Sequence, residues 1–184
     1  YSFLTNIYYI CFTHNSNILE EKTMECMTKT NLILKSLYDE REEVKYAVSG
    51  VDPEILSELA NDDEFDVRIA VAVNNLAPEE VLEILANDEE DDIRCMTAMN
   101  ENTSKNALAI LSEDPNWTIR SCVAIHAKTS RKVLSKLSKD TDSHVRWMAA
   151  LNPHTYKIDL KRMKSDPDAD VRKAATQTMN SLVA

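Results

Sequence analysis

Residues 62–85 read DDEFDVRIAVAVNNLAPEEVLEIL and form one unit of a repeat. The Val-Arg dipeptide of this unit returns every 26 residues, as valine or isoleucine followed by arginine. A period of this length is typical of repeat proteins, in which each unit packs mainly against its neighbours. The dipeptides are Val67-Arg68, Ile93-Arg94, Ile119-Arg120, Val145-Arg146 and Val171-Arg172, with Val44-Lys45 before them.

Each unit predicts a first helix, helix B, around the dipeptide. An aspartate stands five residues before the valine or isoleucine, and aspartate is a favoured N-cap residue, so the dipeptide is expected in the second turn. Apolar residues three and four positions after the valine or isoleucine have the spacing of one buried helix face. A small alanine at the fifth position of four units indicates close contact with another helix. Helix B is predicted to end near Asn74, Asn100, His126 and Asn152.

A second helix, helix A, is predicted a few residues later. Threonine or Pro78 is expected at its start, because threonine is a fair N-cap residue and proline favours the first helical position. Such short helices cannot bury an apolar face alone, so stacking must supply the core. The predicted core pairs are Leu34/Leu37, Ile55/Leu59, Leu82/Leu85, Leu108/Leu111, Leu134/Leu137 and Leu160/Met163. The sequence therefore predicts an all-α solenoid of about six short helix pairs, beginning near residue 28.

These strings resemble the leucine-rich repeat variant family, which is related in style to HEAT-like helical repeats. The resemblance rests on VRIAVAVN at residues 67–74, APEEVL at 77–82 and LAND at 85–88, and it covers roughly residues 40–180. It implies a right-handed superhelix of paired short helices. In that family one helix of each pair tends to be 3₁₀-like, and the sequence leaves open whether this holds here. Some members of the family carry an iron–sulfur domain with clustered cysteines. This chain has no such cluster, and the family has no common reaction, so the resemblance predicts a fold and no cofactor.

Composition restricts the classes of function. The four cysteines form no CxxC pair and have no histidine at metal-ligand spacing, so no metal site is expected. The same cysteine pattern favours a reducing compartment, and we therefore expect a cytoplasmic location. The apolar run at residues 7–12 is too short to cross a bilayer. The net charge of −10 is uneven: residues 39–92 carry 19 acidic and 3 basic side chains, whereas residues 93–184 carry 9 acidic and 15 basic ones. Such asymmetry concerns partners and not the fold.

The chain is expected to divide into an N-terminal extension, residues 1–27, and a helical-repeat domain, residues 28–184. The acidic run before Met24 would be encoded by a nearly pure purine sequence, which resembles a bacterial ribosome-binding site ahead of a start codon. One hypothesis is therefore that a bacterial or phage product begins at Met24 or Met27 and that residues 1–23 are upstream sequence or a poorly ordered arm. The alternative is an ordinary N-terminal extension.

The arginine column has two interpretations: a ladder that binds anions, or a structural ladder in which each arginine pairs with an aspartate of its own or the next repeat. The equal recurrence of arginine and aspartate favours the structural ladder. The column consists of Arg68, Arg94, Arg120, Arg146 and Arg172, with Lys45 before them.

A partner-binding surface is expected on helix B. Positions two residues before and two after each valine or isoleucine share a helix face and vary between repeats, which indicates exposure. Large apolar groups at such positions are typical binding anchors. The alternative is that they pack over the grooves between repeats. The residues concerned are Phe65, Ile69, Trp117 and Trp147.

No catalytic residue is predicted, because no histidine pairs with a nucleophile in a recognisable motif and the chain's one glycine, Gly50, cannot form a phosphate loop. The sequence favours a non-enzymatic scaffold that binds a protein partner on helix B. The alternative is a nucleic-acid-binding or DNA-repair protein like the alkylpurine glycosylases built from HEAT-like repeats, acting through the basic C-terminal half. End-to-end self-association, acidic half to basic half, is a third expectation. The basic side chains are Lys128, Arg131, Lys132, Lys136, Lys139, Lys157, Lys161, Arg162 and Lys164.

Overall fold

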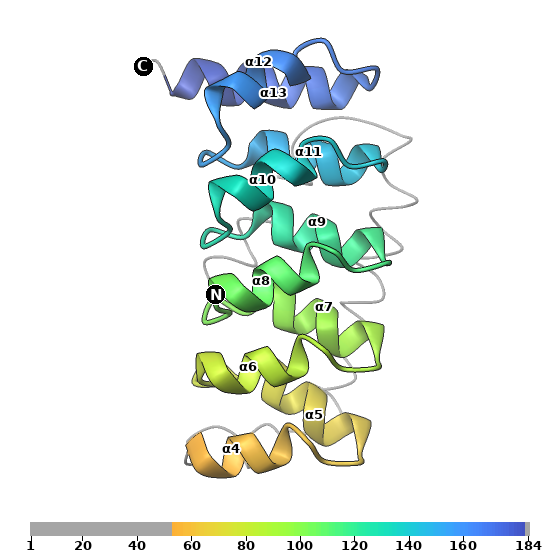
Figure 1. Ribbon diagram of the computed structural model, residues 1–184, viewed down its shortest axis with the longest axis vertical. Coiled ribbons are helices and arrows are strands. Elements are labelled where there is room, and N and C mark those ends of the chain that lie inside the picture. The colour runs from red at the N-terminus through yellow and green to blue at the C-terminus, as the bar shows by residue number, and fades with distance from the viewer. Residues whose placement is uncertain (1–52, 183–184) are drawn as a thin grey trace, which may run out of the picture. The chain divides into compact units, whose positions relative to one another are not determined.

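The computed structural model describes residues 53–182, which belong to the compact unit Glu42–Ala184. Within these residues every regular element is an α-helix, and the helices follow one another as a stack of pairs (Figure 1). The predicted all-α solenoid is therefore confirmed, with five helix pairs in the described residues. The pair expected to begin near residue 28 and the division between residues 27 and 28 lie outside them.

Helices A and B alternate along the chain as the repeat predicts. The helices A have seven residues each: α4 (Pro53–Leu59), α6 (Glu79–Leu85), α8 (Lys105–Leu111), α10 (Arg131–Leu137) and α12 (Lys157–Met163). The helices B are α5 (Phe65–Ala72), α7 (Asp91–Met99), α9 (Trp117–Ile125), α11 (Ser143–Leu151) and α13 (Ala169–Ser181).

Both helix types are α-helical over residues 53–182, which answers within these residues the question whether one helix of each pair is 3₁₀-like. Helix α6 is an example. The Leu82 amide donates to the Pro78 carbonyl, four residues back, and only the turn after the helix tightens to three-residue spacing, from Asn87 to Ile84.

The core lies between the layer of helices A and the layer of helices B. Each helix B contacts the helices B of the neighbouring repeats as well as the helices A beside it. The predicted leucine pairs from Leu82 onward are at most 1% exposed, and the alanine column of helix B is fully buried. The predicted pair Ile55/Leu59 is wrong at Ile55, which is 49% exposed, whereas Leu56 is fully buried. The 26-residue spacing continues from Leu82 back to Leu56, and that spacing decides which side chain faces inward.

The aspartate column does not cap helix B, so this expectation is wrong. Helix α9 begins at Trp117, and its N-cap is Asn116, whose side chain accepts a hydrogen bond from the Thr118 amide. Asp114 lies two residues earlier and accepts from the Asn116 amide at 2.8 Å, which makes a turn ahead of the helix. Consequently Ile119 lies in the first turn of its helix and not in the second.

The threonine column does not cap helix A either. Ser104 and Ser130 are the N-caps of α8 and α10, and their hydroxyls accept from the amides three residues on. The buried Thr129 precedes the cap, and its hydroxyl donates to the Val123 carbonyl at 2.6 Å. The threonine hydroxyl therefore adds a second donor, beside the His126 amide, to a carbonyl in the last turn of helix B.

The residues at the end of helix B form an unexpected ladder between repeats. Asn100 donates through Nδ2 to the carbonyls of Ala72 and Asn74, and Asn152 does the same to Ala124 and His126. His126 replaces asparagine in one repeat: its Nε2 lies 3.1 Å from the Asn100 carbonyl, and its Nδ1 accepts from the Lys128 amide. This geometry requires a neutral imidazole with its proton on Nε2.

Candidate functional site

The arginine column forms ion pairs from one repeat to the next. Arg68, Arg94, Arg120 and Arg146 each place Nε at 2.7–2.9 Å from the aspartate 20 residues later: Asp88, Asp114, Asp140 and Asp166. The Nη1 atom of each donates to two backbone carbonyls in the turn before its own helix. This geometry agrees with the second interpretation of the column, a structural ladder in which each arginine pairs with an aspartate of the next repeat.

Partial burial makes these pairs stronger than surface pairs. The side chains of Arg120 and Asp140 are 14% and 10% exposed. Burial acts to raise the pKa of Asp140, but hydrogen bonds from Arg120 and from the Asp142 amide outweigh it, so this pKa is lowered. The hydrogen bonds that Arg120 donates to Asp140 correspondingly raise the pKa of Arg120. The charged pair therefore fastens the turn of one repeat to the helix of the preceding one.

Arg172 differs from the other arginines of the column. It is exposed, and its Nη1 donates to the carbonyls of Asp166 and Pro167. Within residues 53–182 no carboxylate forms an ion pair with it.

Two predicted partner-binding residues, Trp117 and Trp147, come together around a histidine. The His144 ring contacts Trp117 edge to face at 5.4 Å between ring centroids and Trp147 at 5.3 Å. All three side chains are half-buried, and they join α9 to α11. We call Trp117, His144 and Trp147 the aromatic cluster.

The other two predicted residues lie elsewhere. Phe65 is half-buried at the first residue of α5. Ile69 is fully buried, so the expected exposure of this side chain is wrong. Cys95 and Ser121, at the same position of the next two repeats, are also buried, and the Cys95 sulfur lies 3.9 Å from that of Cys122 on the following helix B.

Sequence reasoning missed His144, although a signal for it exists. Trp117 and His144 are 27 residues apart, one repeat plus one position. Cys95 and Cys122 have the same separation, and their sulfur atoms lie 3.9 Å apart. The hydrogen bond with Cys122, together with burial, raises the pKa of Cys95. A spacing of 27 residues therefore marks contact between neighbouring helices B.

Comparison with solved structures bears on the fold. One match is a leucine-rich repeat variant described as having a novel repetitive structural motif, with 25% sequence identity and a TM-score of 0.59. The match covers 80% of this chain. The chain has the fold of a leucine-rich repeat variant. It spans 60% of the length of that protein, and neither a protein-family model nor a curated protein matches it.

In this leucine-rich repeat variant fold, six of the nine basic side chains singled out from the sequence lie on α10 and α12. Lys128 and Lys136 form ion pairs with Glu79 and Glu113, and Arg162 donates to Ser138. The guanidinium of Arg131 lies over the ring of Tyr156, 5.6 Å from its centroid. Some of these cations are therefore paired with carboxylates or other side chains and others are not, so they do not form a continuous row of available positive charge.

Among the described residues of this leucine-rich repeat variant fold, no three His, Cys, Asp or Glu side chains are grouped to hold a metal ion. None of the helices in this part of the chain has the length and apolar character needed to cross a membrane.

Proposed function

We propose that this leucine-rich repeat variant chain is a non-enzymatic scaffold that binds a protein partner on the helix-B face. The aromatic cluster carries the proposal. Trp117 and Trp147 come from neighbouring repeats, and each keeps part of its surface open to solvent. Tryptophan is enriched among the residues that dominate binding energy at protein interfaces.

The rigidity of the cluster supports this role. His144 packs against both indole rings, and the helices that carry them are fastened by the Arg120–Asp140 pair. Side chains held in place before binding lose little conformational entropy when a partner docks. Negative charge nearer the N-terminus would speed the encounter with a basic partner.

Quantitative pull-down from the native host tests the proposal. The full chain is the bait, and the Trp117→Ala/Trp147→Ala variant is compared with wild type by mass spectrometry. We expect at least one specific partner to be lost at least about tenfold, as for interface tryptophans. The matched control, Ile110→Ala, removes an exposed apolar side chain from α8, 45% exposed, and should retain that partner. If the double variant retains every partner of the wild type, the helix-B face is not the binding surface.

A nucleic-acid-binding or repair function is the second candidate, favoured by the basic side chains of α10 and α12. It conflicts with the engagement of Arg120 and Arg146, whose donors face aspartates and carbonyls. Retention on DNA-cellulose at low salt, lost as salt rises, would support this second function. Absence of retention at low salt would eliminate it.

A further inference from the structure

A hollow of about 410 Å³ lies on the helix-A side of the last two described repeats. Residues of α10, of the turn between α11 and α12, of α12 and of the end of α13 form its walls. They are Arg131, Pro153, Tyr156, Lys157, Ile158 and Leu182. Its volume is within the range of binding pockets for small groups and side chains.

Two of these residues depart from the repeat pattern at the same place. Ile158 is 75% exposed, whereas the residues at its position in the four earlier repeats are all polar: Glu54, Glu80, Asn106 and Lys132. Tyr156 is 42% exposed and occupies the N-cap of α12, where it makes no side-chain cap hydrogen bond, although serine caps α8 and α10. Ile158 is largely in solvent and contributes little to the stack, whereas the Tyr156 ring contacts Arg131 of the preceding repeat and keeps part of its surface in solvent. Adjacent exposed apolar groups of this kind mark interaction sites.

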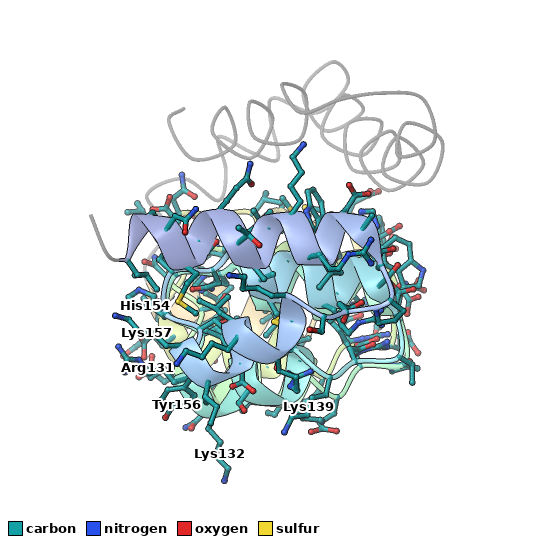
Figure 2. All side chains as sticks on the ribbon, turned by 90° about the horizontal axis from the view of Figure 1, so that it is seen from above. Arg131, Lys132, Lys139, His154, Tyr156 and Lys157 are labelled. Carbon is teal, nitrogen blue, oxygen red and sulfur yellow. The ribbon has the colours of Figure 1, made fainter. Side chains whose placement is uncertain are left out.

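Cations border this apolar surface. Arg131 and Lys157 are the first residues of α10 and α12, and within residues 53–182 neither forms an ion pair with a carboxylate. Figure 2 shows Arg131, Tyr156 and Lys157 on one side of the helices, whereas Lys139 lies away from them. The hollow therefore combines two cations available to an anion with an apolar wall.

The contact between Arg131 and Tyr156 indicates which anion fits. The guanidinium carbon lies over one face of the ring, 5.6 Å from its centroid, so a nucleobase that stacked on this face would have to displace Arg131. Base stacking is how aromatic side chains hold single strands. The edge of the guanidinium can still donate to a carboxylate. Ile158 and Leu182 require an apolar group next to this anion.

We propose that the hollow binds an acidic peptide segment of a partner protein, with a carboxylate side chain next to an apolar one. The carboxylate pairs with Arg131 and Lys157. The apolar side chain enters the hollow against Tyr156, Ile158 and Leu182. This is a second docking surface, on the helix-A side and separate from the aromatic cluster.

Fluorescence anisotropy of a labelled peptide tests this assignment. The probe has alternating glutamate and leucine residues flanked by glycine and serine, and it is titrated with the full chain. We expect saturable binding with Kd on the order of 10–100 μM, weakening as salt rises. The variants Arg131→Glu/Lys157→Glu and Ile158→Lys should each bind at least about tenfold more weakly. The residues changed are exposed, so the fold should persist, which circular dichroism verifies.

Two control variants keep the test specific. Lys139→Glu makes the same kind of charge change at an exposed residue away from the hollow and should retain binding within about twofold. Trp117→Ala/Trp147→Ala should also retain it, so failure of the helix-B proposal would be distinguishable. No saturable binding below about 1 mM overturns the assignment. Equal binding of a glutamine–leucine or a glutamate–serine peptide also overturns it, as does preferential binding of labelled single-stranded DNA.

Discussion

Replacing Asp140 by asparagine removes the charge of one carboxylate between repeats while keeping the size of the side chain. Asp140 accepts from Arg120 Nε at 2.8 Å and from Nη2 at 2.9 Å, a bidentate arrangement. The amide offers one oxygen in place of two and turns a donor toward the guanidinium. Arg120 keeps its hydrogen bonds to the carbonyls of Asp114 and Pro115, and the amide oxygen of asparagine can still accept from the Asp142 amide, so the loss falls mainly on the ion pair.

The magnitude follows from the burial of the pair. Breaking a fully buried ion pair costs roughly 3–5 kcal/mol, and an exposed pair contributes about 0–1 kcal/mol. The Arg120–Asp140 pair lies between these limits, with side chains 14% and 10% exposed. We expect Asp140→Asn to lower the free energy of unfolding by about 2 kcal/mol. At about 2–4 °C per kcal/mol, the melting temperature should fall by about 4–8 °C.

Urea and thermal unfolding, followed by circular dichroism, measure this loss. The matched control is Asp142→Asn, which makes the same charge change in the same turn. Asp142 is the N-cap of α11, and asparagine already serves as N-cap of α9, so a loss below about 0.5 kcal/mol is expected. In a double-mutant cycle with Arg120→Met, the coupling energy should be about 2 kcal/mol. Equal losses for Asp140→Asn and Asp142→Asn would refute the reasoning.

Three further predictions concern pH and the core. Burial lowers the pKa of His126, as does the charge of Lys128, and together they outweigh its hydrogen bond to Asn100. The unfolded chain therefore binds more protons below pH 6.5, and the free energy of unfolding falls there by at most about 1.4 kcal/mol per pH unit. His126→Asn should reduce this slope in urea titrations at about pH 5–7. The pKa values of Asp140 and Asp166 are lowered in the folded chain, so the stability that these carboxylates contribute is complete above their ordinary pKa of 3.8 and is lost as the pH falls below it. Circular dichroism should show unfolding at acid pH, and Asp140→Asn should make the dependence of stability on pH less steep. Leu108→Ala, at 1% exposure, should cost about 2–5 kcal/mol in urea unfolding, whereas Ile110→Ala on the same helix should cost less than about 1 kcal/mol, and similar costs would contradict the described core.

The core could be predicted from the sequence, because burial of a leucine depends mainly on its position within its own helix and the repeat returns that position every 26 residues. Leu108 and Leu111 follow directly from the 26-residue spacing. Local rules failed where a side chain acts on another repeat. Asp114 matches a helix cap by its type and place, but Arg94 of the preceding repeat binds its carboxylate and the cap falls to Asn116. A capping rule reads only a few neighbouring residues and cannot include such a partner.

The candidate site was predictable in part for the same reason. Trp117 and Trp147 stood out as large side chains at variable positions, and both contact the same residue, His144. The residue between them, His144, was missed because its contact with Trp117 crosses a repeat boundary. Ile69 was misjudged because variation between repeats was taken as exposure, whereas Ile69, Cys95 and Ser121 are all buried at this position.

Hydrogen-exchange mass spectrometry of the full chain, with and without the partner recovered by pull-down, tests the helix-B proposal most directly. The account predicts slower exchange on binding in peptides from α9 and α11, which carry the aromatic cluster. Protection confined to α8 and α10, with α9 and α11 unchanged, would contradict it.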